Sequence, residues 1–438
     1  MKPKFNLKYS IACLTVLTSL TSGATEFNVG APPEIFKINQ SADNFENTHS
    51  IIPETEKYTS GQDHILLDRK KNRLLVFTLD QTLISVDLKD NTIKMLGHTP
   101  GMGGGAKFDP NNPNKVFFCA TKEEGKVYPP TIETGLYEVD LSNDRPRFRL
   151  ILSRVLKDKP DLEKNGTVYS IKDAPQISLS DLDKSNDTRP FGVCDDIAIS
   201  KDGQRIYIAE PYDTQDGGFG DEFNGKTNQE EILMAKQNGK LWMLDRNSEK
   251  LFLLGTGFAF LDGILIEKYD SYGRETSLLF TELSRYRLLR LNISDSSAEL
   301  EKVFENLPGM PNALEVDDLG RIYMAFNKMR SFSLDLSINF PIFKRAFQKF
   351  LLKAPQFLKP IPKETGIVTL EIQPDDTYKP VYYTVHNGSL ITSISNVVPD
   401  FKNDKLYFAI FDRRYPGIHA ISIPEKLKIK QNNETQLH

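Results

Sequence analysis

The chain repeats one short pattern six times, and this repetition restricts its possible folds more than any other feature of the sequence. Each copy contains an apolar, strand-like run, a polar turn and a second apolar run. Most copies are followed by a further β-rich run, such as TLISVDL, GLYEVDL or GKLWMLD, so a unit offers about four strands. The first residues of the six copies are Asp63, Gly104, Asp195, Asp262, Asn312 and Ser395.

Six tandem units of this kind predict an all-β fold, a six-bladed β-propeller. A single blade cannot bury both of its faces, so the blades must pack side by side in a ring. The alternatives are a β-sandwich or a two-domain chain divided near residue 180, but sandwiches do not repeat in this way. We place the propeller in residues 61–425, after an N-terminal extension (25–60) and before a polar tail (426–438).

Composition adds two limits. Hydrophobic residues make up 39% of the 438, which is enough for a packed core. The net charge of −4 provides no overall basic excess, so we expect no nucleic-acid partner.

The first 24 residues have the pattern of a secretory signal peptide. A basic start (2–8) precedes a short apolar run (11–20) and then small residues (22–24), and about ten apolar residues are too few to cross a bilayer. We therefore expect export to the periplasm or the exterior. The mature chain would keep Cys119 and Cys194, which could form a disulfide in an oxidising compartment or remain two buried thiols.

A basic, aromatic segment (337–364) differs from the repeats. Its amphipathic part near Ile342 to Leu352 predicts one helix inserted between blades five and six. The favoured interpretation is a helix that covers blade edges. Association with a membrane surface or a partner is the less favoured alternative.

The first residue of each copy carries the chemical information. In a propeller these residues begin the innermost strands and meet at one mouth of the central channel, where carboxylates would repel one another and be costly to desolvate. A hard cation with oxygen ligands removes that cost, whereas zinc would favour His or Cys, which these positions lack. We predict one Ca²⁺ held by Asp63, Asp195, Asp262 and Asn312. The alternative is that these residues only cap turns.

Several segments also carry a family resemblance. VCDDIAISKDGQRIYIAE, LDGILIEKYDSYGRETSLLFTELSRYRLLRLNI and LPGMPNALEVDDLGRIYMAF resemble blades three, four and five of the strictosidine-synthase-like branch of the calcium-dependent propellers. That superfamily also includes senescence marker protein, gluconolactonase and paraoxonase. The inserted basic segment and the last repeat resemble its C-terminal blade, so the resemblance extends from about Gly61 to Ile423.

The resemblance places the family's metal ligands on the same four positions. A first-blade Glu corresponds to Asp63, third- and fourth-blade Asn residues correspond to Asp195 and Asp262, and a fifth-blade Asp-Asn pair corresponds to Asn312 and Ala313. Only Ala313 lacks an oxygen.

The catalytic residues of the family transfer less well. The Glu that strictosidine synthase uses corresponds to Ser395, and the catalytic His of paraoxonase falls in the glycine run 103–105. We expect close backbone packing there. The candidate catalytic residues are then Asp262 and Asp195, with His64 as a weaker candidate because strand alternation could turn it away from the channel.

The resulting hypothesis is a calcium-dependent hydrolase of small esters or lactones, with residues 211–228 shaping the pocket. The first alternative is a non-catalytic binding propeller with a structural calcium. The second is a strictosidine-synthase-like enzyme that forms carbon–nitrogen bonds, which Ser395 weakens.

Overall fold

A computed structural model describes residues 29–38, 50–143, 145–157, 166–213, 226–330 and 362–428, together with Asp335, Phe350 and Lys353. The predicted signal peptide and nearly all of the predicted inserted helix lie outside these residues. Among the described residues, no helix is both long and apolar enough to span a bilayer.

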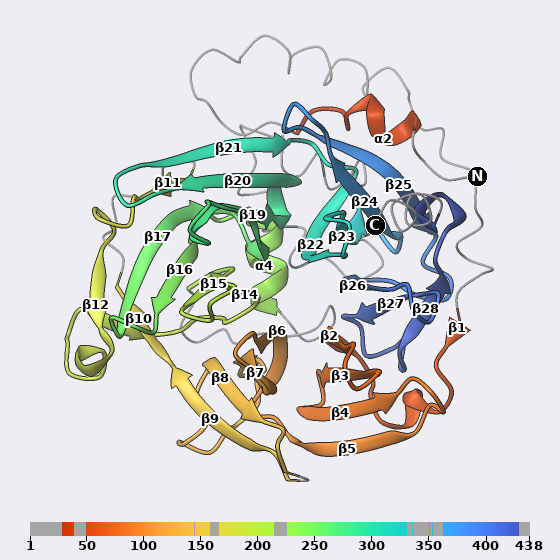
Figure 1. The fold of residues 1–438 in the computed structure, drawn as a ribbon, viewed down its shortest axis with the longest axis horizontal. Coiled ribbons are helices and arrows are strands. Elements are labelled where there is room, and N and C mark those ends of the chain that lie inside the picture. The colour runs from red at the N-terminus through yellow and green to blue at the C-terminus, as the bar shows by residue number, and fades with distance from the viewer. Residues whose placement is uncertain are drawn as a thin grey trace, which may run out of the picture.

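The described residues form six antiparallel sheets around a central axis, which confirms the predicted six-bladed β-propeller (Figure 1). From the axis outward, blade one contains β2 (Gln62–Asp68), β3 (Arg73–Thr78), β4 (Thr82–Asp87) and β5 (Ile93–His98). Blade two contains β6 (Met102–Asp109), β7 (Asn112–Thr121), β8 (Gly135–Asp140) and β9 (Arg147–Leu152). Blade three contains β14 (Ile197–Ile199), β15 (Arg205–Glu210), β16 (Gly239–Asp245) and β17 (Lys250–Phe258), with β11 (Thr167–Val168) and β12 (Gln176–Ser178) beyond β17.

The other three blades follow the same order. Blade four contains β18 (Leu261–Tyr269), β19 (Glu275–Glu282), β20 (Arg287–Ile293) and β21 (Ala298–Phe304). Blade five contains β22 (Gly309–Val316), β23 (Ile322–Met329), β24 (Thr365–Ile372) and β25 (Tyr378–His386). Blade six contains β26 (Ile394–Asp400), β27 (Lys405–Ile410), β28 (His419–Ser422) and β1 (Ser50–Ile51).

Shorter elements lie before, between and within the blades. They are the two-stranded sheet of β10 (Arg154–Leu156) and β13 (Thr188–Pro190), the helices α2 (Glu34–Ile38) and α4 (Lys226–Met234), and the 3₁₀ turns η1 (Thr55–Lys57), η2 (Leu179–Asp181) and η3 (Leu283–Arg285). In Figure 1, α4 lies near the centre of the ring, beside the inner strands of blades three and four.

Strand β1 closes the ring. Ser50 pairs with Ala420 and Ile51 with His419, so a segment from the N-terminal extension supplies the outer strand of the last blade. Behind it, the Ile52 N–H donates to the carbonyl of Ile418 at 2.8 Å. The repeat pattern did not predict this closure.

The inserted segment lies elsewhere than predicted. Strands β23 and β24 pair directly, so residues 330–364 separate the second and third strands of blade five and do not lie between blades five and six. The prediction was wrong because RSFSLDL (330–336) has the alternation of a third strand, whereas Thr365–Ile372 occupies that place.

The start of the predicted tail is packed. Leu427 is buried in the core of blades five and six, and its carbonyl accepts a hydrogen bond from Arg321 Nη1 at 2.8 Å.

The cores lie between neighbouring blades. Phe77 of blade one and Phe118 of blade two have ring centroids 4.9 Å apart, and Phe258 of blade three and Phe280 of blade four are 5.1 Å apart. Each inter-blade layer therefore buries apolar side chains from two sheets, as the repeat predicts for blades that cannot fold alone.

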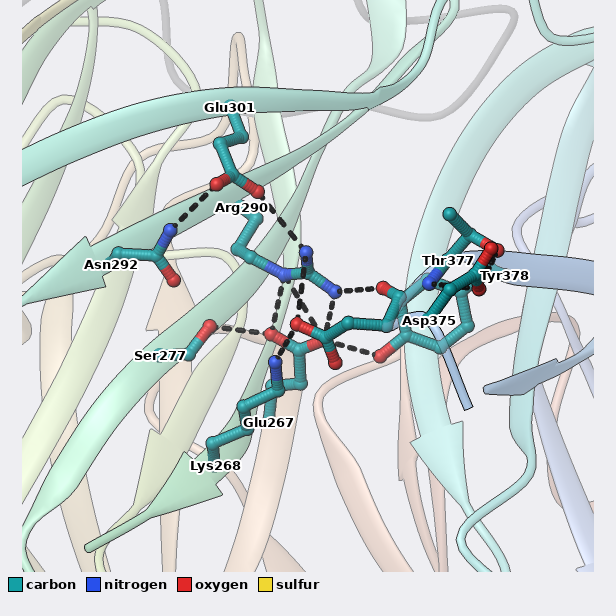
Figure 2. Close-up of polar contacts among 10 residues, drawn as sticks. Glu267, Lys268, Ser277, Arg290, Asn292, Glu301, Asp375, Thr377 and Tyr378 are labelled. Atoms are coloured by element: carbon teal, nitrogen blue, oxygen red, sulfur yellow. Dashed lines mark hydrogen bonds and ion pairs between the residues drawn. The ribbon is translucent and has the colours of Figure 1, made fainter. Parts of the chain in front are cut away.

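A polar network joins blade four to the outermost strand of blade five (Figure 2). Arg290 Nη2 lies 2.6 Å from Glu267 Oε1, the Tyr378 hydroxyl donates to the same oxygen at 2.5 Å, and Arg290 also donates to the Asp376 carbonyl at 3.1 Å. Burial alone would raise the pKa of Glu267, but hydrogen bonds from Arg290, Ser277 and Tyr378 together hold it below its ordinary value.

Candidate metal centre at the channel mouth

The innermost strands share a backbone irregularity at the first residue of each copy. In five blades, the regular antiparallel pairing between the first and second strands shifts at this point. The shifts fall between Gln62 and His64, Gly103 and Ala106, Leu261 and Ile264, Pro311 and Leu314, and Ile394 and Asn396. In blade three, Asp195 lies just before β14 and its N–H donates to the Ala209 carbonyl at 3.1 Å. Such bulges re-aim side chains, here at matching positions around the axis.

Three of the predicted ligands influence one another electrostatically. Burial raises the pKa of Asp63 to about 7, with a contribution from Asp196, against a lowering hydrogen bond from Ser395. Burial and then the charges of Asp262, Asp63 and Asp196 raise the pKa of Asp195 well above its ordinary value. The pKa of Asp262 is raised in the same way, by burial first and then by Asp63 and Asp196. Carboxylates from blades one, three and four therefore lie near one another.

The chemistry of these residues fits a hard cation. Asp195 Oδ2 is buried without a hydrogen-bond partner, and Asn312 Oδ1 accepts the neighbouring Ala313 N–H at 2.9 Å. Carboxylate and amide oxygens are the ligands that calcium prefers. Within the described parts of the chain, however, no three His, Cys, Asp or Glu side chains lie close enough together to hold a metal ion by themselves.

Glycines allow the ligand-bearing segments to pack closely. A Cβ on Gly104 would lie 2.5 Å from the Asp195 carbonyl oxygen, and a Cβ on Gly105 would lie 1.9 Å from Asp196 Oδ1. The expected close backbone packing at the glycine run is confirmed. Gly263 has the same role between blades four and five, where a Cβ would lie 2.5 Å from the Asn312 carbonyl oxygen.

Hydroxyl groups hold the backbone of the ligand positions from the neighbouring blade. Thr281 Oγ1 donates to the Asn312 carbonyl at 3.1 Å, and Ser395 Oγ donates to the Asp63 carbonyl at 2.8 Å. Ser395, which stands where the resemblance implies a catalytic Glu, thus fixes a candidate ligand.

A second group of polar residues lies further along the channel. Lys107 Nζ is 2.5 Å from Glu315 Oε1, and the two residues come from blades two and five, which face each other across a six-membered ring. Asn396 Nδ2 donates to the same Glu315 oxygen at 3.4 Å. Both charged side chains keep 18% of their surface exposed, so water reaches this pair inside the ring. Burial would lower the pKa of Lys107, but the charges of Glu315 and Asp196 raise it.

His64 belongs to this second group. The bulge at Asp63 turns His64 into the channel, so the expectation from simple alternation is wrong. Its Nε2 lies 3.5 Å from Glu315 Oε1, is buried and has no hydrogen-bond partner. Burial, and then the charge of Lys107, lower the pKa of His64 well below its ordinary value. The imidazole is therefore neutral, and a catalytic role for it stays a prediction.

Sequence reasoning did not find Tyr212, which lies between β15 and β16. Its hydroxyl donates to Asn228 Oδ1 on α4, and its ring lies 5.6 Å from that of Phe260. Burial raises the pKa of Tyr212 well above its ordinary value, with contributions from Glu231 and Asp195, so the phenol lies near the carboxylates. The signal available in the sequence was only its place in the segment 211–228.

Apolar side chains stand two residues before four of the six repeat positions. They are Met102, Val193, Phe260 and Met310, and all four belong to one buried cluster that also includes Tyr212 and Leu233 of α4. Each of the four is two residues away from a repeat position along the chain, and Leu233 joins α4 to the same cluster.

No protein-family model matches the chain. A strictosidine synthase-like protein of Arabidopsis thaliana is 27% identical over 124 residues, which cover 28% of this chain and 31% of that protein. The adipocyte plasma membrane-associated protein of Danio rerio is 23% identical over 205 residues, which cover 46% of each chain. The chain therefore aligns with less than half of the length of either relative.

A gluconolactonase from Xanthomonas campestris has a similar fold. It superposes with a TM-score of 0.50 at 10% identity, covering 93% of this chain and 99% of that one. The fold defines the class, a six-bladed β-propeller. The comparisons support the predicted resemblance: the chain is similar in sequence to a strictosidine synthase-like protein and in fold to a gluconolactonase.

Proposed function

We propose that the protein is a calcium-dependent hydrolase of esters or lactones, with one Ca²⁺ held by Asp63, Asp195, Asp262 and Asn312. One observation carries the proposal: three buried carboxylates share a register at the channel mouth, and one of their oxygens has no hydrogen-bond partner. Without a cation, this group would be a costly concentration of like charges.

The calcium ion and the side chains around it have separate roles in the proposed hydrolysis. A bound calcium ion supplies Lewis-acid polarisation of the carbonyl group. Asp195 or Asp262 accepts the proton of the water that attacks the carbonyl carbon, and the same proton passes to the alkoxide when the C–O bond breaks. Tyr212, near Asp195 and held by Asn228, is placed to orient the substrate.

Export is part of the proposal. Cys119 and Cys194 form a disulfide with Cα atoms 5.1 Å apart, so of the two alternatives for these cysteines the structure has the bond. Disulfides persist in oxidising compartments, which supports a periplasmic or secreted protein.

The test is hydrolysis by the purified mature chain of a panel of aryl esters and lactones, with calcium or with a chelator. We expect turnover with calcium and loss of at least about a hundredfold in rate for Asp195→Asn or Asp262→Asn, in the range for removing a proton acceptor. Asp318→Asn, at a side chain 74% exposed, is the matched control and should keep full activity. Turnover that is unaffected by chelation would contradict the proposal.

A non-catalytic binding propeller is the second candidate. Ser395 and the glycine run 103–105 replace the family's catalytic Glu and His, which favours this alternative. In that case calcium would raise the melting temperature, and no ester or lactone would be hydrolysed. Ser395 also disfavours carbon–nitrogen bond formation.

A further inference from the structure

The disulfide joins blade two to the residue before a candidate calcium ligand. Cys119 lies in β7, whereas Cys194 immediately precedes Asp195 at the entrance to blade three. Both cysteines are buried, at 0% and 2% exposure. The bond is therefore one peptide unit away from the ligand-bearing residue and is shielded by the inter-blade core.

Hydrogen bonds from blade two hold the same short segment. Thr121 Oγ1 donates to the Cys194 carbonyl at 2.9 Å and accepts the Cys194 N–H at 3.0 Å. The Gly105 N–H donates to the Asp195 carbonyl at 2.6 Å. The backbone on both sides of the Asp195 Cα is thus fixed from β6 and β7.

Within blade three, the hold on this segment is weaker. Strand β14 begins at Ile197, and Asp195 and Asp196 exchange backbone hydrogen bonds with Ala209 alone. The position of the Asp195 side chain consequently depends on blade two as much as on its own sheet. Its Oδ2 needs a fixed position to act as a ligand, because it has no hydrogen-bond partner of its own.

We propose that the Cys119–Cys194 disulfide and Thr121 position Asp195 for cation binding, so that calcium affinity depends on the oxidation state of this cysteine pair. The inference rests on the proposed calcium site and adds its dependence on redox state. A dithiol reductant transfers two electrons and two protons to the bond, which gives two cysteine thiols and the cyclic disulfide of the reductant.

The experiment measures the calcium dissociation constant by calorimetry in the wild type and in the double variant Cys119→Ala/Cys194→Ala. We expect affinity to fall about tenfold, equivalent to about 1.4 kcal/mol. Thr121→Val, which keeps the disulfide and removes the hydroxyl, should weaken binding by about threefold. Arg290→Met, at the interface of blades four and five, controls for a general loss of stability and should leave the affinity unchanged.

The outcomes separate the two proposals. If the wild type binds no calcium, the proposed function fails. If the wild type binds calcium and a folded double variant binds it equally well, the disulfide does not position Asp195 and this inference is overturned. If the double variant does not fold, Thr121→Val decides, and an unchanged affinity for it overturns the inference.

Discussion

At the scale of the residue, two consecutive acids at the channel mouth have different environments. Asp196 Oδ1 accepts the Ile197 N–H, and Asp196 Oδ2 accepts the Ile264 N–H. Burial raises the pKa of Asp196 to about 6, although the charge of Lys107 acts to lower it. Asp195 keeps one oxygen without a partner. The sequence DD alone does not distinguish the two acids, because the bulges that orient neighbouring side chains differently arise from pairing between strands.

Replacement of Lys107 in the channel should destabilise the folded protein. Lys107→Met would leave Glu315 and Asp196 without their cation in the interior of the ring. We expect the free energy of unfolding to fall by about 3 kcal/mol, at the lower end for breaking a buried ion pair because water reaches this one. Urea denaturation would measure the loss. Lys89→Met, at an exposed residue, should change it by less than about 0.5 kcal/mol, and an equal effect of the two substitutions would contradict this expectation.

At the scale of the element, the strands were largely predictable and their partners were not. The runs TLISVDL, GLYEVDL, GKLWMLD and YRLLRLNI are β4, β8, β16 and β20, because alternation is a local property of the chain. RSFSLDL alternates equally well, yet the third strand of blade five comes from residues 365–372. Pairing decides between such segments, and it depends on contacts far apart in the sequence.

The network between blades four and five gives stability a dependence on pH. The pKa of Glu267 is lower in the folded state than its ordinary value of 4.5. The ionised carboxylate therefore makes its full contribution to the free energy of unfolding above pH 4.5, and this contribution is lost as the pH falls through the folded-state pKa. Glu267→Gln should therefore lower the free energy of unfolding by about 2 kcal/mol at pH 7, with a smaller difference from the wild type below pH 4.5. Thermal unfolding between pH 3 and 7 would show this. Glu299→Gln, at an exposed position of β21, is the control, and a difference for Glu267→Gln that does not vary with pH would count against the argument.

At the scale of the whole molecule, the sixfold repeat predicted both the ring and the place of its acids, since matching positions of tandem units meet at the axis. It could not predict α4 or the closing strand. Strand β1 is two residues long, too short to show a period, and α4 follows a long insertion in blade three.

Closure of the ring should be measurable through Thr55. Its hydroxyl donates to the Ile52 carbonyl at 2.7 Å and accepts the Ile418 N–H at 3.0 Å, and the residue is fully buried. Thr55→Val should cost about 1–3 kcal/mol, because it leaves the buried Ile418 N–H without a partner. A melting curve would detect this, with the exposed Thr131→Val as the control. Identical melting temperatures for the two variants would show that Thr55 does not stabilise the closure.

The pairing of Ile51 with His419 also sets an order of events during synthesis. Strand β1 leaves the ribosome long before its partner β28 has been synthesised, so β1 stays unpaired with β28 while the other blades form. If β1 is not in place when β28 forms, β28 is a bare edge that can pair with another chain. If the protein is exported as proposed, a chaperone that holds the N-terminal strand during translocation would protect the last blade, although it binds the opposite end of the sequence.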